Sequence, residues 1–403
     1  MTNNIKDKIS ITLIDGFDGD GGLETEWEQL FESSPTASPP LRWGWLREWW
    51  RVYGAAYGHG LRVLAVRKGP RLIGALPLYL GRKLGSTFST RRLGFVSTGE
   101  SHSEATCAEY LDLLHDPGDA AVCLDALRSY LVAVEAGHWD ELELPDISER
   151  SPLLAWGSAF ERGWYRARLT ETGSCPRANL TDGFEAYLGR LSSNTRQQSR
   201  RLLRAARAAG CVFEIASDLG GADTFFDQLV RLHQARWVRA GKPGSFASAR
   251  FTDFHGALIR SWVPDGKAVL ARLSLAGEPL AVLYGFPGKG KFDFYQSGVV
   301  IDEAGPVRSP GVAAHLMLME HLGGMGITSY DFLRGDSPYK QRLMTDEGRL
   351  MRVRVVRRNV RVAADRASDI MRRVLARGIR LIRNPLNGPR PGVGHDSTLP
   401  AAR

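Results

Sequence analysis

LAVLYGFPGKGKFDFYQSGV, residues 280–299, contains two β-rich runs on either side of Pro287-Gly288-Lys289-Gly290. Glycine accepts the positive φ of a tight turn, so this stretch predicts a β-hairpin. Further on, Ser309-Pro310-Gly311 precedes VAAHLMLMEHL, whose apolar residues recur at helical spacing. Ser309 suits an N-cap and Pro310 a first helical residue. We therefore expect a helix packed against the sheet that contains the hairpin.

The start of this helix is suited to a phosphate or pyrophosphate group. Its free N–H groups and the positive end of the helix dipole attract anions, Gly311 has no side chain to block them, and Arg308 adds a charge. An ordinary capped helix is the alternative. The helix ends at Gly323-Gly324, and a strand near 327–333 follows. Its carboxyl end, where open α/β sheets bind ligands, carries Arg334, Asp336, Tyr339 and Lys340.

The run YDFLRGDSPYK at 330–340, with Ser309-Pro310-Gly311 before it, resembles GNAT-type acyltransferases of the cellulose-biosynthesis CelD-like group, relatives of the Fem peptidoglycan peptidyltransferases. The resemblance covers roughly residues 40–350 and is strongest over 180–345. That family binds coenzyme A through a loop written Gln/Arg-x-x-Gly-x-Gly/Ala, which Arg308, Gly311 and Ala313 match. The resemblance implies acyl-CoA as co-substrate, with these cofactor-binding residues: Arg308, Ser309, Gly311, Val312, Ala313 and, as a second anion contact, Lys340.

An internal repeat is visible in the sequence. VLAVRKGPRLIGALPLYL at 63–80 resembles VLARLSLAGEPLAVLYGF at 269–286, and each is followed by a strand, a loop, a helix and a strand. In the first copy the helix follows Asp116 and Asp119, whose charges would repel a phosphate. Only the second copy is therefore predicted to keep an anion pocket. The first is free to bind the acceptor, a division of labour that the resemblance to duplicated Fem-type folds also implies.

These observations predict an α/β (α+β) chain of two tandem GNAT-like domains, each a mixed, mostly antiparallel sheet flanked by helices. The stretch 171–181 has little apolar pattern and is the expected boundary. The expected domains are residues 1–172, on the acceptor side, and 173–350, with the acyl-CoA site. Residues 351–403 are expected to form a final strand, a basic amphipathic helix over 363–382 and a disordered tail after 392.

Amide formation from a thioester needs a group that accepts the proton of the amine and a group that stabilises the departing thiolate. Residues 109–112 are predicted to form a strand edge on which Tyr110 and Asp112 share a face, with His102 and Glu104 on the loop before it. Asp331 and Arg334 have the alternative of pairing with each other or with backbone. The candidate catalytic residues are Tyr110, Asp112, Tyr295 and Asp336, and the candidate substrate-binding residues are Glu109, Gln296, Arg334 and Tyr339.

Two further patterns have both a functional and a structural interpretation. A long helix predicted over 184–209 aligns Arg196, Arg200, Arg204 and Arg207, which suit the phosphates of coenzyme A, a nucleotide-linked acceptor or tRNA, or form a solvated basic face. Four tryptophans at 43–50 could stack sugars, but aromatic residues at helical spacing favour a core.

Composition limits the alternatives. The net charge of +9 predicts anionic neighbours, and four cysteines without CxxC spacing indicate neither a disulfide framework nor a metal site. No signal region or membrane span is recognised, so we expect a cytoplasmic protein whose basic helix docks either on its own domain or on the inner face of an anionic membrane. Ser-His-Asp order, zinc-ligand spacing and a Walker loop are also not recognised.

The leading hypothesis is an acyl-CoA-dependent N-acyltransferase acting on an amino group of a sugar, polysaccharide or cell-envelope precursor. An aminoacyl-tRNA-dependent ligase of the Fem type is the alternative enzyme, since the basic helix suits RNA. A catalytically silent binding protein of exopolysaccharide assembly is the third possibility.

Overall fold

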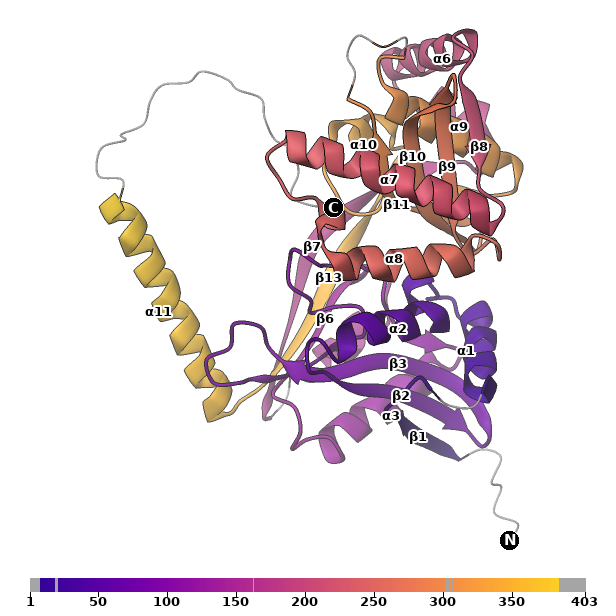
Figure 1. The fold of residues 1–403 in the computed structure, drawn as a ribbon. Helices are drawn as coiled ribbons and strands as arrows, with labels where there is room; N and C mark the ends of the chain where they lie inside the picture. Colours follow the sequence, from indigo (N-terminus) through magenta and orange to yellow (C-terminus); the bar gives the residue numbers. More distant parts are fainter. Residues whose placement is uncertain (1–7, 19–20, 162, 302–304, 306, 384–403) are drawn as a thin grey trace.

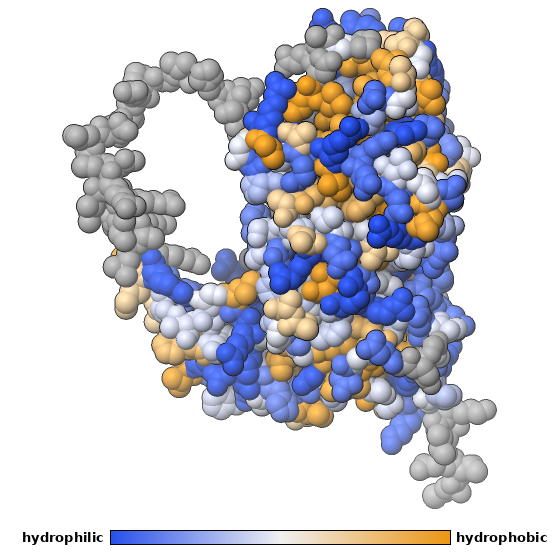
Figure 2. Space-filling view, in the orientation of Figure 1, coloured by the Kyte–Doolittle hydropathy of each residue, from blue (hydrophilic) through white to orange (hydrophobic). Residues whose placement is uncertain are grey.

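A computed structural model describes residues 8–18, 21–161, 163–301, 305 and 307–383. Thirteen strands in this part of the chain form one sheet with helices on both of its faces (Figure 1). On the surface shown in Figure 2, hydrophilic and apolar residues are interspersed over both halves of the molecule. The tail after 392 lies outside the described residues.

Each half of the sheet has the same order of strand pairings. Three antiparallel pairings are followed by one parallel pairing, in the first half through β1 (Ile9–Ile14), β2 (Gly60–Lys68), β3 (Arg71–Arg82), β4 (Arg91–Phe95) and β6 (Glu141–Ser148). The second half repeats this through β8 (Val212–Ile215), β9 (Val269–Leu275), β10 (Glu278–Gly288), β11 (Lys291–Val299) and β12 (Ser329–Asp331). A short strand, β5 (Leu114–His115), pairs with β3. The predicted duplication and the predicted hairpin are confirmed.

Two long strands, β7 (Tyr165–Asn179) and β13 (Asp346–Arg357), join the halves. They pair with each other in antiparallel fashion, while β7 also pairs with β12 and β13 with β6. Strand β7 therefore follows the first half in sequence and pairs with a strand of the second half, whereas β13 follows the second half and pairs with a strand of the first. The stretch 171–181, expected as the domain boundary, lies largely within β7.

The helices cover the sheet in both halves (Figure 1). Their bounds are α1 (Gly21–Ser33), α2 (Trp43–Trp49), α3 (Ala120–Ala133), α4 (Leu153–Ser158), α5 (Phe184–Arg190), α6 (Ser193–Ala208), α7 (Leu219–Arg239), α8 (Ala249–Trp262), α9 (Pro310–Gly324), α10 (Pro338–Leu343) and α11 (Val360–Arg383), with short turns η2 (Pro39–Leu41), η3 (Trp50–Gly54) and η4 (Ser245–Ala247). The single helix predicted over 184–209 is wrong. It divides into α5 and α6 because the side chain of Ser192 caps a new helix by accepting from the Thr195 N–H.

The tryptophan cluster belongs to the core, as the spacing predicts. Trp45 is fully buried and packs against Phe254 and Phe286 of the second half. Its indole N–H donates to Ser97 Oγ at 2.7 Å. These contacts bury apolar surface between the two halves in addition to the strand pairing.

The start of α11 is attached to the loop between β3 and β4. Asp365 accepts hydrogen bonds from the Phe88 N–H and from the hydroxyls of Ser86 and Thr90, and Asp369 pairs with Lys83 at 3.1 Å. Further along α11, the side chains of Ile370, Met371 and Val374 are exposed. In the described part of the chain, no helix combines the length and the apolar composition that crossing a bilayer requires.

Candidate functional site

The central cavity, about 470 Å³, lies between the two halves. It is bounded by neighbouring strands that diverge from each other. Residues Lys291–Asp293 of β11 pair with Ser329–Asp331 of β12, but β11 then continues along β10 alone within the described residues. Residues 294–297 on one strand and 334–340 after the other therefore form two walls of the cavity.

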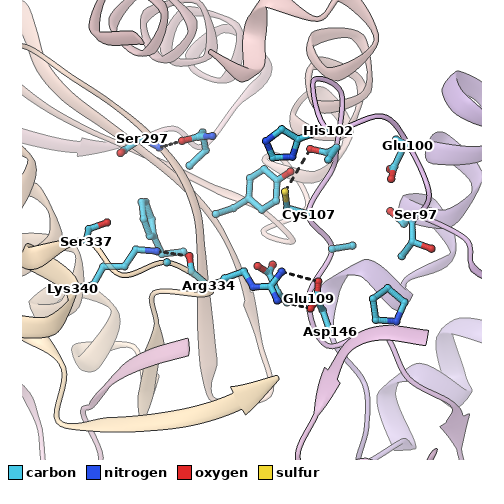
Figure 3. Close-up of a pocket in the computed structure, with 18 of the residues that line it drawn as sticks. Ser97, Glu100, His102, Cys107, Glu109, Asp146, Ser297, Arg334, Ser337 and Lys340 are labelled. Carbon is cyan, nitrogen blue, oxygen red and sulfur yellow. Dashed lines mark hydrogen bonds and ion pairs between the residues drawn. The ribbon is translucent and has the colours of Figure 1, made fainter. Parts of the chain in front are cut away.

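The first half contributes the opposite walls in the same way. Strand β4 pairs with β6 only over Arg92–Gly94. Residues 97–100, which follow β4, and residues 145–146, which lie within β6 beyond this pairing, line the same cavity. The loop residues His102, Cys107 and Glu109 complete this side (Figure 3). The gaps between diverging strands in both halves thus open into one space.

Glu100 is a carboxyl group in this cavity that no sequence pattern indicated. Its Oε1 accepts hydrogen bonds from Trp49 Nε1 at 2.5 Å and from Thr106 Oγ1 at 2.6 Å. Burial raises the pKa of Glu100, and these two hydrogen bonds partly oppose the rise. Its position in the sequence could have indicated this location, because Glu100 follows β4, the fourth strand of the first copy. The equivalent strand in the second copy is β11, which carries Tyr295 and Gln296.

An ion pair joins the halves at the edge of the cavity. Arg334 binds both oxygens of Asp146, at 2.8 and 3.1 Å, and Asp146 also accepts from Thr172 Oγ1 at 2.7 Å (Figure 3). The pairing of Arg334 with Asp331 that the sequence left open is therefore not present. Arg334 remains partly exposed and lines the cavity.

Asp331 belongs to a buried group of charges outside the cavity lining. It lies 2.9 Å from Arg177 Nε and 3.1 Å from Lys291 Nζ, and it accepts from Tyr110 Oη at 2.8 Å. Burial would raise the pKa of Asp331, but Lys291 and Arg177 outweigh it and hold that pKa below its usual value. These contacts link the first half to β7, β11 and β12.

Residues 109–112 do not form the predicted strand edge. The segment is irregular, and Tyr110 has a φ of +62°. Tyr110 points toward Asp331, while Asp112 accepts from Ser151 Oγ at 2.9 Å and from the Leu113 N–H. Burial raises the pKa of Asp112 to about 7. Neither Tyr110 nor Asp112 lines the central cavity, so the structure does not bring them together there.

The segment after β12 brings Tyr339 and Lys340 to the cavity, whereas Asp336 is exposed and outside its lining. Lys340 is buried, and its Nζ donates to the carbonyl oxygens of Phe332 and Arg334, both at 2.8 Å. Burial lowers the pKa of Lys340 to about 8. Burial also raises the pKa of Tyr339.

The remaining predicted site residues on β11 face the same cavity. The hydroxyl of Tyr295 donates to the carbonyl of Thr106 at 2.5 Å and lies 2.8 Å from His255 Nε2. Gln296 accepts from the N–H of Ser297. Tyr295 is thus fixed by two hydrogen bonds that leave its ring on the cavity wall.

A second cavity of about 340 Å³ lies at the start of α9. It is lined by Arg308, Ser309, Gly311 and Val312, and by Val299 of β11. Ser309 and Pro310 hold the predicted N-cap and first helical positions, although the Ser309 side chain makes no capping hydrogen bond. Ala313 is fully buried and outside the lining.

Gly311 has a packing role that the sequence did not reveal. A Cβ atom at this position would lie 3.0 Å from Val299 Cγ2, so glycine also permits α9 to approach β11 closely.

A third cavity, about 690 Å³, adjoins the same helix start on the side of α6. Arg201, Arg308 and Arg342 contribute its cationic lining. None of the four arginines of the predicted stripe lines this cavity. Two of them form ion pairs: Arg200 with Glu185 at 2.7 Å and Arg207 with Glu320 at 2.6 Å. The face of α6 next to the stripe therefore lines the cavity.

No group of three or more potential metal ligands occurs among the described residues.

Comparison with known proteins supports this description. A family model described as an acetyltransferase (GNAT) domain matches residues 193–341, whereas no curated protein sequence matches the chain. The structure of FemX is similar, with a TM-score of 0.56 and 12% identity over 84% of this chain and 96% of FemX.

Two further solved structures are similar over most of their length. One is the C-terminal domain of a putative lysylphosphatidylglycerol synthetase from Agrobacterium fabrum, with a TM-score of 0.51 and 13% identity over 86% of this chain and 94% of that one. The other is L-PGS from Bacillus licheniformis, with a TM-score of 0.50 and 12% identity over 90% and 98%. The chain thus has a GNAT-type acyltransferase fold, present in two copies.

Proposed function

We propose that the protein is an N-acyltransferase that transfers an acyl group from acyl-CoA to an amine. Residues 1–172 form the acceptor side in this proposal, and residues 173–350 hold the donor. The supporting observation is that the three cavities adjoin one another through shared lining residues. Arg308 lines both cavities at α9, Arg236 and Ser297 line the second and the central cavity, and Tyr339 lines all three.

The donor would follow this path. Its pyrophosphate would lie against the first turn of α9, where helix N–H groups and Arg308 provide positive potential. The pantetheine arm would run beside Ser297 toward the central cavity. Its thioester would then lie where both halves contribute polar side chains.

The chemistry requires two proton transfers. The amine nitrogen attacks the thioester carbonyl, and Glu100, with its raised pKa, takes the proton that the nitrogen loses. The carbon–sulfur bond then breaks, and Tyr339 donates a proton to the thiolate. Tyr295 shapes the cavity wall, while Tyr110 and Asp112 support the structure in this proposal.

The acceptor is proposed to be an amino group of a sugar or other cell-envelope precursor, as the likeness to the CelD-like group implies. The carboxyl groups of Glu100 and Glu109 in the central cavity suit an ammonium group, whereas Asp146 is paired with Arg334. Helix α11, with exposed apolar residues and several arginines, is proposed as a contact with an anionic membrane surface.

Exposure of the protein to acetyl-CoA and longer acyl-CoAs tests the donor directly. A donor bound only by the folded protein raises its melting temperature, and turnover releases thiol once an amine such as glucosamine is added. We expect both signals. A binding protein without catalysis would show no thiol release with any amine, and absence of a thermal shift with every acyl-CoA would contradict the proposal.

An aminoacyl-tRNA-dependent ligase is the second candidate, because the similarity to FemX extends over 84% of this chain. Such an enzyme neutralises several phosphates, so its tRNA binding weakens steeply with salt. Replacement of Arg196, Arg200, Arg204 and Arg207 by Gln would flatten that slope. Tight, salt-sensitive binding of aminoacyl-tRNA without a response to acyl-CoA would favour this candidate.

A further inference from the structure

A fourth cavity, about 570 Å³, lies on the central strands β7 and β13. Four arginines and two threonines line it together with one glutamate: Arg168, Thr170, Glu171, Thr172, Arg334, Arg352 and Arg354. In the strand register Arg354 is directly opposite Arg168, and Arg352 is opposite Thr170. Alternate residues of a strand share one face, so these side chains project from the same side of the sheet.

The arrangement holds more positive than negative charge. Arg354 pairs with Glu141 at 2.7 Å, Arg352 lies 3.5 Å from Glu143, and Arg92 contacts both of these glutamates. Arg334 is paired with Asp146. Arg168 is exposed, and no carboxylate of the described residues pairs with it.

Two arginines directly opposite each other on neighbouring strands repel, which costs stability. Glu141 offsets part of this cost through its ion pair with Arg354. A phosphate bound by Arg168 would offset more of it, because the planar donor pattern of arginine matches the oxygens of a phosphate. The cavity is large enough for a phosphate or pyrophosphate group. Thr170 adds a hydroxyl beside the arginines.

The position of this cavity relates it to the proposed reaction, because Arg334 lines both this cavity and the central one. We propose that the arginine cavity binds the phosphate or pyrophosphate group of the acceptor, whose amine then enters the central cavity. This inference rests on the proposed function and narrows it to an amine that carries phosphate. The phosphate could belong to a soluble sugar derivative or to a lipid head group.

Inorganic pyrophosphate is a direct probe. We would titrate it into full-length protein saturated with coenzyme A, so that the α9 site is already filled. The double variant Arg168→Gln, Arg352→Gln should bind pyrophosphate at least tenfold more weakly. Arg166→Gln removes one positive charge two residues from Arg168 on an exposed part of β7, and it should change the affinity less than twofold. Equal affinities in both variants and the parent protein would overturn the proposal.

The same variants separate this proposal from the donor assignment. The affinity for coenzyme A should be unchanged in the double variant. If the parent protein does not bind coenzyme A, the pyrophosphate titration is made without it. Loss of pyrophosphate binding in the double variant alone would then support the arginine cavity while the donor assignment fails.

Vesicles distinguish the two sources of the phosphate. If a lipid head group is the ligand, saturating pyrophosphate should weaken binding to phosphatidylglycerol vesicles and leave only the part that α11 contributes, and the double variant should bind the vesicles more weakly than Arg166→Gln. If the ligand is soluble, an amino sugar linked to a nucleoside diphosphate should compete with pyrophosphate for the arginine cavity. Phosphatidylglycerol vesicles should then not compete with pyrophosphate.

Discussion

Glu100 lies at the point where the first half of the sheet opens into the central cavity, and its carboxyl group combines burial with two hydrogen bonds from Trp49 and Thr106. A buried carboxyl group with a raised pKa is a better proton acceptor near neutral pH than an exposed one. The surrounding side chains hold it in one position, which a general base requires.

We therefore expect Glu100→Gln to lower kcat/KM by about 10²–10⁴-fold, the usual contribution of a general base. The amide keeps an oxygen for Trp49 and Thr106. In the parent enzyme kcat/KM should rise with pH through the raised pKa of Glu100, and this rise should be absent in the variant. Glu104→Gln is the control, because Glu104 is on the same loop but pairs with Arg250 outside the cavity lining. Comparable activity of the two variants would show that Glu100 is not the base.

Tyr339→Phe tests the proton donor. Removal of the hydroxyl should lower kcat by at least about tenfold, while KM for acyl-CoA changes little because the ring remains. The loss should shrink with acyl donors whose leaving thiol is more acidic. Tyr295→Phe is the comparison, since the hydroxyl of Tyr295 is bonded to Thr106 and His255. A larger effect on kcat at Tyr295 would reverse the assignment.

Asp112 gives a prediction about stability. Its pKa is about 7 in the folded protein and about 4 when unfolded, so the folded state favours the protonated form. The contribution to stability is fully present below about pH 4 and is lost as the pH rises through 7, by at most roughly 4 kcal/mol. Asp112→Asn should flatten this loss between pH 5 and 8 in urea unfolding and keep enzyme activity. A catalytic role would instead abolish activity, whatever the change in the pH dependence of stability.

Among the elements, α9 and α3 occupy equivalent places in the two copies and differ in their proposed roles. Val312 is the third residue of α9 and lines two cavities, and Val122 is the third residue of α3 and is 42% exposed. Val312→Asp should weaken coenzyme A binding by at least tenfold, about 1.4 kcal/mol, because of charge repulsion. An acidic residue in a first helical turn is tolerated, so folding should persist.

The matched variant Val122→Asp should leave coenzyme A affinity unchanged. An effect of Val122→Asp alone would assign the donor to the first half. Gly311→Asp is less suitable as a test, since its Cβ atom would press on Val299 and disturb the packing of α9.

Elements with strong local signals were predictable from the sequence. The turn at 287–290 fixed the hairpin, and Ser309-Pro310 fixed the start of α9. Contacts between distant residues had no local signal. Arg334 pairs with Asp146, 188 positions away, and the irregular backbone at Tyr110 follows from tertiary contacts and not from its β-like residue pattern.

At the scale of the whole molecule, the two halves share their central strands. A fragment of residues 1–172 would retain part of β7 but lack β13, the partner of β6. We expect such a fragment to aggregate through the exposed edge of β6, and the intact protein to unfold in one cooperative transition in urea. Two separated transitions, with a stable monomeric 1–172 fragment, would instead support independent domains divided at residue 172.

The pairing of β7 and β13 with strands of the opposite half also limits how the protein can move. Domains connected by a flexible linker rotate about a hinge. Here two continuous strands, β7 and β13, are hydrogen-bonded to each other along their length and connect the halves rigidly. Closure around substrates must therefore come from side chains and from the loop at residues 97–108. The radius of gyration measured by X-ray scattering should stay constant when acyl-CoA and acceptor bind, and selectivity would then arise from the fixed width of the opening.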